Sequence, residues 1–296
     1  MDVALIVNPF ASEVTEERVR AVEAELRTAA TVETMPTARP LHAAELAEGA
    51  SGADALVVYS GDGGFNEVLN GVSDAIPVGF LPGGRTNVLP RALGLPRDPV
   101  AAARQVAEAL RAERNRTIGL GRVNGRRFAF AAGLGLDAEL VRRVDALGRR
   151  RDGRRRGDLA YLLAAASLVT DRRGSFEPVL EIAGLGSAAF ALVANCDPYT
   201  YAGRLPIRVA PLARFELGLD VVAPVAVKPL GLARLLRYVF LGRGQTEAAD
   251  VRYGHDLDRI EIACERPLPL QADGEDLGDV EHAVFEAERD AVRVLV

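Results

Sequence analysis

The segment VVYSGDGGFNEV, residues 57–68, decides the fold of this chain. It contains a buried-strand pattern, then a tight glycine turn, then the start of a helix. Such a turn directs backbone N–H groups and a helix N-terminus outward, which suits an anionic phosphate. The segment VGFLPGGRTN, residues 78–87, repeats this order of strand, glycine turn and helix. Two such turns on neighbouring strands suit a nucleoside triphosphate.

Strand and helix patterns alternate around these turns up to about residue 118. We expect strands at residues 3–7, 55–59 and 76–81, and helices at residues 16–30, 66–72, 87–93 and 100–112. The alternation predicts a parallel sheet with helices on both faces. Ligands of such sheets bind beyond the C-terminal ends of the strands, where both glycine turns lie.

A different pattern begins after about residue 116. Asn124-Gly125 is typical of a type I′ hairpin turn. Short β runs follow at residues 128–132, 179–182, 188–194, 219–225, 259–264 and 280–285, and helices are expected at 138–147, 159–169 and 230–241. The β runs predict a second domain, a sandwich or an open barrel. The last run, residues 291–296, predicts a strand that returns to the first domain.

The predicted fold class is therefore α/β plus β. An N-terminal three-layer α/β nucleotide-binding domain would cover residues 1–118, with the strand at about 289–296 returning to it. A C-terminal β-sandwich domain would cover residues 119–288.

Composition narrows the class of protein. A net charge of −5 argues against a nucleic-acid partner. Two distant cysteines, Cys196 and Cys264, form no disulfide framework, which favours a reducing, cytoplasmic setting. The longest apolar run, residues 159–169, is about half of the ~20 residues that a membrane span needs, so we expect any membrane contact to be peripheral.

Two common nucleotide motifs are excluded. A P-loop needs a lysine after its glycine, but the only lysine, Lys228, precedes a proline. A dinucleotide fingerprint needs a third glycine where Asn66 stands and an acidic residue at the end of the next strand, where Leu81 and Pro82 stand.

The remaining pattern resembles a known family. Residues 60–71, SGDGGFNEVLNG, are similar to the GGDGTxNEVxNG signature of the diacylglycerol kinase catalytic-domain family, which includes bacterial soluble lipid kinases and is related to sphingosine kinases and NAD kinases. Four further segments resemble that family in the same order: Asn8-Pro9, residues 81–87, residues 133–138 and residues 270–275. The five matches cover nearly the whole chain.

The resemblance implies an NAD kinase/diacylglycerol kinase-like fold. It also implies an ATP-dependent phosphotransferase that uses Mg²⁺ and phosphorylates diacylglycerol or a related lipid. The β-rich domain would bind the lipid. It implies three catalytic carboxylates: Asp273 as general base, Glu275 and Asp62, of which Asp62 and Glu275 would also bind the metal. The residues expected to contact the nucleotide are Asn8, Pro9, Ser60, Gly61, Asp62, Gly63, Gly64, Asn66, Glu67, Gly83, Gly84, Arg85, Thr86 and Asn87. Of these, Thr86 and Asn87 could also cap their helix.

Three positions depart from the family pattern. Gly64 stands where threonine is usual, Arg85 where serine or threonine is common, and Val88 where the lipid kinases often have aspartate. Two alternatives therefore stay open: a kinase of a soluble acceptor such as NAD, and a nucleotide-binding regulatory protein without catalysis.

A basic segment predicts the surface that meets the membrane. Its arginines are Arg149, Arg150, Arg151, Arg154, Arg155 and Arg156. We expect them to contact anionic lipid, and so expect a cytoplasmic protein that reaches its lipid substrate at the inner face of the membrane. A homodimer stays an open alternative.

Overall fold

The computed structural model describes residues 1–73, 76–148 and 158–296. The chain divides into two compact units, each considered by itself. Unit 1 comprises Met1–Gly119 and Asp290–Val296, and unit 2 comprises Leu120–Arg289. The predicted basic contact at residues 149–156 lies outside the described residues.

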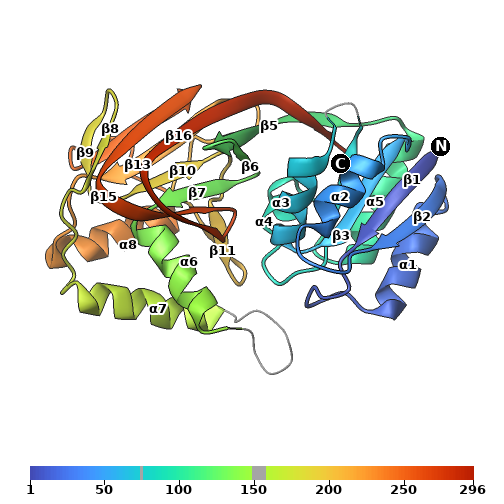
Figure 1. The fold of residues 1–296 in the computed structure, drawn as a ribbon, viewed down its shortest axis with the longest axis horizontal. Coiled ribbons are helices and arrows are strands. Elements are labelled where there is room, and N and C mark those ends of the chain that lie inside the picture. Colours follow the sequence, from blue (N-terminus) through green and yellow to red (C-terminus); the bar gives the residue numbers. More distant parts are fainter. Residues whose placement is uncertain (74–75, 149–157) are drawn as a thin grey trace. The chain divides into compact units, whose positions relative to one another are not determined.

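Unit 1 is built on a parallel sheet (Figure 1). Its strands are β1 (Asp2–Val7), β2 (Thr31–Pro36), β3 (Ala55–Ser60) and β4 (Val78–Pro82), in the order β4-β3-β1-β2. Every residue of β3 and β4 is buried, as expected of central parallel strands covered on both faces. Near the C-terminus, Val294 pairs in parallel with Val78, so the predicted return of the last strand is confirmed.

The helices of unit 1 pack in two pairs. They are α1 (Glu16–Leu26), α2 (His42–Gly49), α3 (Asp62–Gly71), α4 (Val88–Ala92) and α5 (Pro99–Arg111). Helix α1 packs against α5, and α2 packs against α3. Asp98 begins α5, accepting the N–H of Ala101 before a proline at the first helical position.

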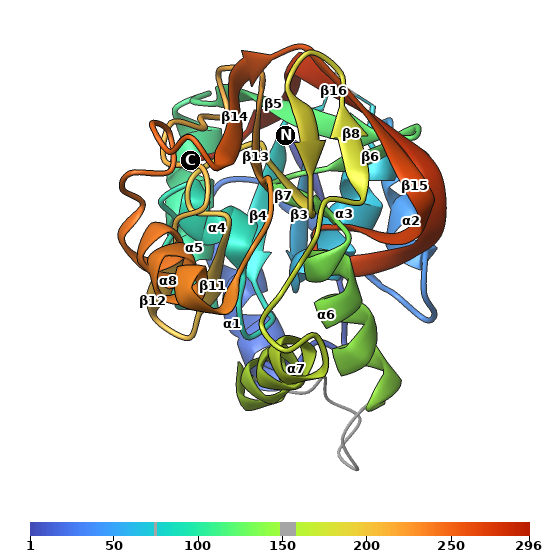
Figure 2. The same cartoon turned by 90° about the vertical axis from the view of Figure 1, so that its left-hand side faces the viewer.

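Unit 2 is dominated by antiparallel strands (Figure 2). The main order is β14 (Val251–Leu257), β13 (Leu219–Pro224), β10 (Ala191–Ala194), β7 (Ala131–Leu134), β15 (Arg259–Ala272) and β16 (Glu275–Val294). Strand β15 also pairs with β8 (Leu180–Ile182), which pairs with β9 (Gly186–Ala188). Phe128 and Phe285 meet edge to face in the core, with ring centroids 6.5 Å apart.

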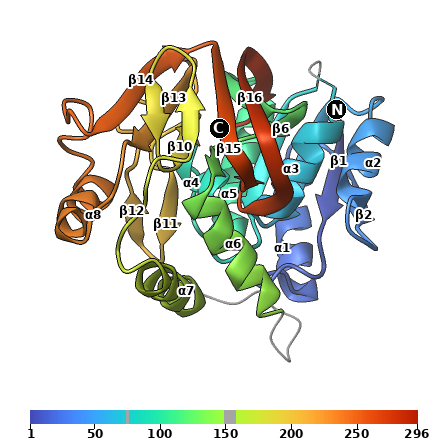
Figure 3. The ribbon, with the colours of Figure 1, turned by 60° about the vertical axis from the view of Figure 1, so that its left-hand side comes forward.

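Two hairpins and three helices complete unit 2. The predicted Asn124-Gly125 turn joins β5 (Arg116–Val123) to β6 (Arg126–Phe128), and both turn residues have positive φ, as type I′ requires. A separate hairpin pairs β11 (Thr200–Ala202) with β12 (Leu205–Ile207). The helices are α6 (Leu136–Ala146), α7 (Asp158–Asp171) and α8 (Leu232–Leu241), with a 3₁₀ turn η1 (Pro229–Gly231) before α8 (Figure 3). The predicted α/β plus β class is confirmed.

Several expected boundaries were wrong. The helix expected at residues 66–72 begins at Asp62, because Gly63 and Gly64 form its first turn rather than a loop. The helix expected to reach residue 30 ends at Leu26, and a strand follows it. The two C-terminal strands are far longer than expected, with 14 residues in β15 and 20 in β16.

Candidate active site

The first glycine turn presents the N-terminus of a helix. Gly61 has extended backbone angles and begins α3, and its carbonyl accepts the N–H of Phe65 at 3.1 Å. Because glycine has no side chain, this position supplies no cap to the first amides of α3. Amides of this kind, at the positive end of the helix dipole, form a suitable site for a phosphate.

The two glycine turns are joined directly. The N–H of Gly83 donates to the carbonyl of Ser60 at 2.6 Å, and the N–H of Val88 donates to Asp62 Oδ1 at 2.7 Å. The turns also touch at their glycines, since a Cβ on Gly84 would lie 2.8 Å from the Cα of Gly61. Only glycine permits this approach. The carboxylate of Asp62 therefore connects the first turn to the start of α4.

Asn87 shapes the second turn, but not in the way expected. The prediction that it caps its own helix was wrong, because its left-handed backbone, φ 51°, turns the side chain back onto Gly84. The N–H of Gly84 donates to Asn87 Oδ1 at 2.8 Å, and Asn87 Nδ2 donates to the Gly84 carbonyl at 2.6 Å. Thr86 makes no recorded side-chain cap either, and its carbonyl accepts Arg91 Nη1 at 3.3 Å.

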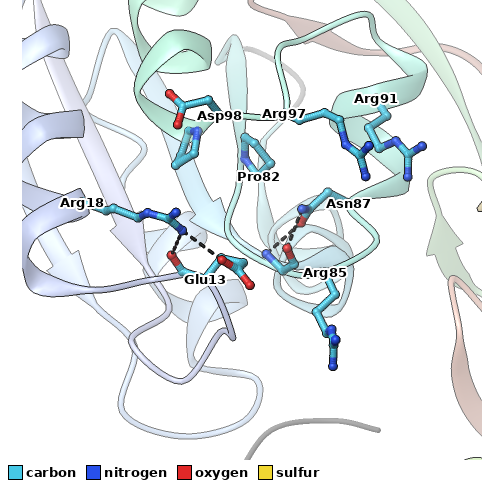
Figure 4. A pocket seen from close by; sticks show the side chains of 10 residues that line it. Glu13, Arg18, Pro82, Arg85, Asn87, Arg91, Arg97 and Asp98 are labelled. Atoms are coloured by element: carbon cyan, nitrogen blue, oxygen red, sulfur yellow. Dashed lines mark hydrogen bonds and ion pairs between the residues drawn. The ribbon is translucent and has the colours of Figure 1, made fainter. Parts of the chain in front are cut away.

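A cavity of about 270 Å³ lies beside the second turn (Figure 4). Four arginines and two acidic residues line it together with glycine, asparagine and proline: Glu13, Arg18, Pro82, Gly84, Arg85, Asn87, Arg91, Arg97, Asp98 and Pro99. Arg18 is paired with Glu13 at 3.0 Å. The excess of guanidinium groups favours an anionic ligand.

Other residues predicted to contact the nucleotide have partners in the fold. Asn8 accepts the N–H of Phe10 at 3.0 Å in an Asx turn, and the adjacent Pro9 is exposed. Asn66 is fully buried, and its carbonyl and side-chain oxygens accept Asn70 Nδ2. Glu67 accepts the N–H of Ala43 at the start of α2, at 3.2 Å. Their contact with a nucleotide stays a prediction.

Ser60 and Gly64 share one space. A Cβ on Gly64 would lie 2.1 Å from Ser60 Oγ and 2.8 Å from Ser60 Cβ. Ser60 is 1% exposed, and its hydroxyl has no hydrogen-bond partner among the described residues. The serine hydroxyl thus occupies the place that a residue-64 side chain would take. The departure at Gly64 was half of the signal in the sequence; the other half, serine at position 60 where the quoted signature has glycine, was missed.

The carboxylate of Asp273 is bound by backbone amides. Asp273 Oδ2 accepts the N–H of Ala129 at 2.6 Å, and Oδ1 accepts those of Phe130 at 3.0 Å and Ala131 at 3.2 Å. The residue is 4% exposed and has a left-handed φ of 49° in the turn between β15 and β16. It therefore fixes the segment between β6 and β7, and its role as general base stays a prediction.

Glu275 lies in an ion pair. Its Oε2 pairs with Arg126 Nη2 at 2.6 Å. Within the described parts of the chain, no group of three or more His, Cys, Asp or Glu side chains could hold a metal. Magnesium can use a single carboxylate plus phosphate oxygens, so the carboxylate of Asp62 in unit 1 fits an ion completed by a nucleotide. Its assignment to Asp62 and Glu275 stays a prediction.

A buried network that the sequence did not reveal holds the Asp273 turn. Gln271 Nε2 and the Tyr199 hydroxyl both donate to Asp137 Oδ2, at 2.6 and 2.7 Å. The other end of the Gln271 amide accepts the N–H of Gly274 at 2.8 Å. Burial raises the pKa of Asp137, which favours its neutral form. The motif at residues 133–138 contained this aspartate, but nothing in its spacing indicated a partner 134 residues away.

We expect Asp137→Asn to make the stability of the protein less dependent on pH. The raised pKa of Asp137 means that the folded state binds a proton that the unfolded state releases above about pH 4. Stability from this group is therefore present at low pH and is lost as the pH rises toward the folded-state pKa. Asparagine does not titrate, so the melting temperature of the variant relative to that of the parent should rise as the pH is raised above about 4. Thermal unfolding at several pH values checks this, and a difference that does not change with pH would contradict it.

Comparison with known proteins agrees with this geometry. Residues 2–123 match the family described as the diacylglycerol kinase catalytic domain. Residues 131–296 match the YegS C-terminal NAD kinase beta sandwich-like domain.

Individual relatives extend the comparison. A protein of Bacillus subtilis (strain 168) named diacylglycerol kinase is 35% identical over 123 residues, which cover 40% of this chain and 38% of that protein. The match therefore spans about two fifths of the relative's length. A crystal structure described as a diacylglycerol kinase from Bacillus anthracis str. Sterne has a TM-score of 0.72 at 19% identity, covering 99% of this chain and 96% of that one. Another structure from that organism has a TM-score of 0.78 at 23% identity, with 99% and 94% covered.

The two structures show the shared fold, and the two domain matches together cover nearly all of the sequence. The chain belongs to the diacylglycerol kinase family, with the catalytic domain followed by the YegS-type β-sandwich domain.

Proposed function

We propose that this protein is an ATP-dependent lipid kinase that transfers the γ-phosphate of ATP to the hydroxyl of diacylglycerol or a related lipid. The observation that carries the proposal is the joined pair of glycine turns, which presents the N-terminus of α3 beside an arginine-lined cavity. Family membership supports kinase chemistry, and the named B. subtilis relative supports diacylglycerol as the acceptor.

The residues of unit 1 would bind the donor. The amides at the start of α3 bind phosphate oxygens, while Asn87 holds Gly84 in place for a second contact. Arg85 and Arg91 balance the charge of the phosphates. ATP would supply the phosphoryl group, and Mg²⁺ held with Asp62 would neutralise the charge that develops during transfer.

The acceptor side would use the carboxylates of unit 2. In the transfer, the bond from the γ-phosphorus to the β-bridging oxygen breaks, and a bond to the acceptor oxygen forms. The acceptor proton passes to a carboxylate, which we assign to Asp273. Three backbone amides fix the position of that carboxylate. A weak base is sufficient, because proton removal is late in a loose transition state.

We further propose that the lipid acceptor is met at an anionic membrane surface on the cytoplasmic side. No helix within the described ranges is long and apolar enough to cross a bilayer. Contact with the lipid would be made from the surface of the protein, as expected for residues 149–156.

One assay tests the proposed function. The purified protein is incubated with γ-labelled ATP and Mg²⁺, with diacylglycerol micelles, a sphingoid base, NAD or no acceptor. Asp62→Asn tests the donor half and Asp273→Asn the acceptor half, each after its folding is checked by thermal unfolding. Label in diacylglycerol that both variants lose supports the proposal. Label in NAD alone identifies a soluble-acceptor kinase, and ATP binding without transfer to any acceptor identifies a regulatory protein; either result overturns the lipid-kinase proposal.

A further inference from the structure

Unit 2 exposes a cationic, apolar helix. Residues 228–243, KPLGLARLLRYVFLGR, contain four basic residues and no acidic one, in a chain whose net charge is −5. They form η1 and α8 in the structure. Four large apolar side chains on this segment face solvent: Leu230 is 98% exposed, Leu236 55%, Phe240 40% and Leu241 59%. Single exposed leucines are common in proteins, but four on one short segment form a patch that indicates an interaction surface.

The fold does not need this exposed face. The inner face of α8 buries Tyr238, and Leu232 and Leu235 pack on a small core cluster of Phe176, Ala189, Phe190 and Val227. The contacts on the inner face therefore hold α8 in position, while Leu236, Phe240 and Leu241 on the outer face stay exposed. A rigid apolar face of this kind is available to a partner without rearrangement of the core.

The charges on the segment identify the partner. Arg234 pairs with Asp250, and three more exposed cations lie on the segment: Arg237 within α8, Lys228 before η1 and Arg243 after α8. A helix with basic and bulky apolar side chains is typical of one that lies in the interface of a bilayer. A second copy of this chain fits less well, because a two-fold interface would bring two cationic faces together.

A cavity beside α8 has the same mixed character. It has a volume of about 520 Å³ and is lined by Lys228 and by the paired Arg234 and Asp250, together with apolar residues that include Val225, Leu235 and Val251. Because Asp250 balances the charge of Arg234, Lys228 is the cation that would meet the phosphate of an amphiphile whose acyl region lies on the apolar wall. Helix α7 also exposes leucines, Leu159, Leu162 and Leu163, but has no lysine or arginine within its bounds.

We propose that residues 228–243 dock on an anionic membrane, with α8 lying in the plane of the interface and Leu236, Phe240 and Leu241 among the acyl chains. This inference rests on the proposed function in one respect: an enzyme with a lipid acceptor has to reach the membrane that contains the acceptor. Its test needs no catalysis, so the two can fail separately.

Vesicle binding by the full chain tests the docking. Co-sedimentation is measured with vesicles of phosphatidylcholine alone and with vesicles that also contain phosphatidylglycerol, an anionic lipid that gives the surface a negative potential. We expect binding only to the anionic vesicles and its loss at high salt. Each cation near such a surface contributes about 1 kcal/mol, which is roughly fivefold in affinity, so Arg237→Gln with Arg243→Gln should weaken binding about 25-fold. Leu236→Ser with Leu241→Ser should reduce it further.

Matched controls lie on unit 1. Arg20 and Arg27 of α1 are exposed, with side chains 78% and 54% accessible, and Leu41 is 56% exposed. Arg20→Gln with Arg27→Gln, and Leu41→Ser, should leave vesicle binding unchanged. Thermal unfolding confirms that every variant is folded.

Other outcomes overturn the inference. Unchanged binding by both α8 variants overturns it, whether or not the protein phosphorylates lipid. Binding lost in Leu162→Ser but kept in the α8 variants assigns docking to α7 instead. A dimer in sedimentation analysis that the α8 leucine substitutions dissociate, without any vesicle binding by the parent, identifies a second copy as the partner. Vesicle binding through α8 without transfer of label to any lipid leaves the docking standing and overturns the proposed function.

Discussion

Replacing Asp273 by asparagine is expected to lower both the melting temperature and the rate of phosphotransfer. Three backbone N–H groups donate to its carboxylate, and an asparagine amide would turn an NH₂ group toward at least one of them. Hydrogen bonds to a charged group contribute about 1.5–3 kcal/mol each, so we expect a loss of about 3 kcal/mol. In a domain of this size that is a fall of about 6–12 °C, measured by thermal unfolding.

The same variant separates the two roles of Asp273. A general base contributes about 10²–10⁴-fold, so the rate per folded molecule should fall by at least 100-fold. Glu275→Gln is the control for the melting temperature alone, because Glu275 is partly exposed and pairs with Arg126; we expect the melting temperature of this variant to change by less than about 3 °C. A lower melting temperature with an unchanged rate per folded molecule would show that Asp273 only positions the backbone. An unchanged melting temperature would contradict the structural role of its amide contacts.

The second large effect is expected at Ser60 and Gly64. A threonine at position 64 would place its Cβ 2.1 Å from Ser60 Oγ and 2.8 Å from Ser60 Cβ, so Gly64→Thr should distort the start of α3. Overpacking of this kind costs about 1–3 kcal/mol, and we expect ATP affinity to fall at least tenfold because the phosphate amides move. The double variant Ser60→Gly, Gly64→Thr removes the obstacle and should restore both stability and affinity.

A double-mutant cycle measures this coupling. Parent, both single variants and the double variant are compared by thermal unfolding and by titration with ATP. We expect an interaction energy of about 1–3 kcal/mol in favour of the double variant. Additive effects of the two substitutions would contradict the shared space. If stability is restored without affinity, the serine hydroxyl contributes to phosphate binding in a way that threonine does not replace.

Local patterns predicted the parts of the fold that have strong local signals. The sequence correctly predicted the buried strands β3 and β4 and the Asn124-Gly125 turn. Fully buried strands consist mainly of apolar residues, and positions with positive φ favour asparagine and glycine, so both features can be recognised from residue type. Strand β2 was missed because its sequence, TVETMP, is polar and half exposed at the edge of the sheet. Helix α2 was missed because it begins after Leu41, a left-handed residue that carries no capping signature.

The contacts within the candidate site were not predictable from the sequence. The glycine turns follow two buried strands as expected, yet the bond from Val88 to Asp62 joins residues 26 apart and has no mark in either motif. Asn87 was expected to cap a helix because asparagine often does, and its positive φ changed the outcome. The Asp137–Gln271–Tyr199 network was missed because each residue is an ordinary polar residue until the fold buries it.

The distances along the chain also set an order of assembly. The contacts that join the two glycine turns span 26 residues or fewer, whereas the amides that hold Asp273 lie up to 144 residues from it. Contacts between distant residues require the closure of long loops, and they form late in folding. During synthesis from the N-terminus, every residue that joins the two glycine turns is therefore made before Asp273. Strand β16 follows Asp273 and pairs with β4 at Val294, so one strand contributes residues to both units.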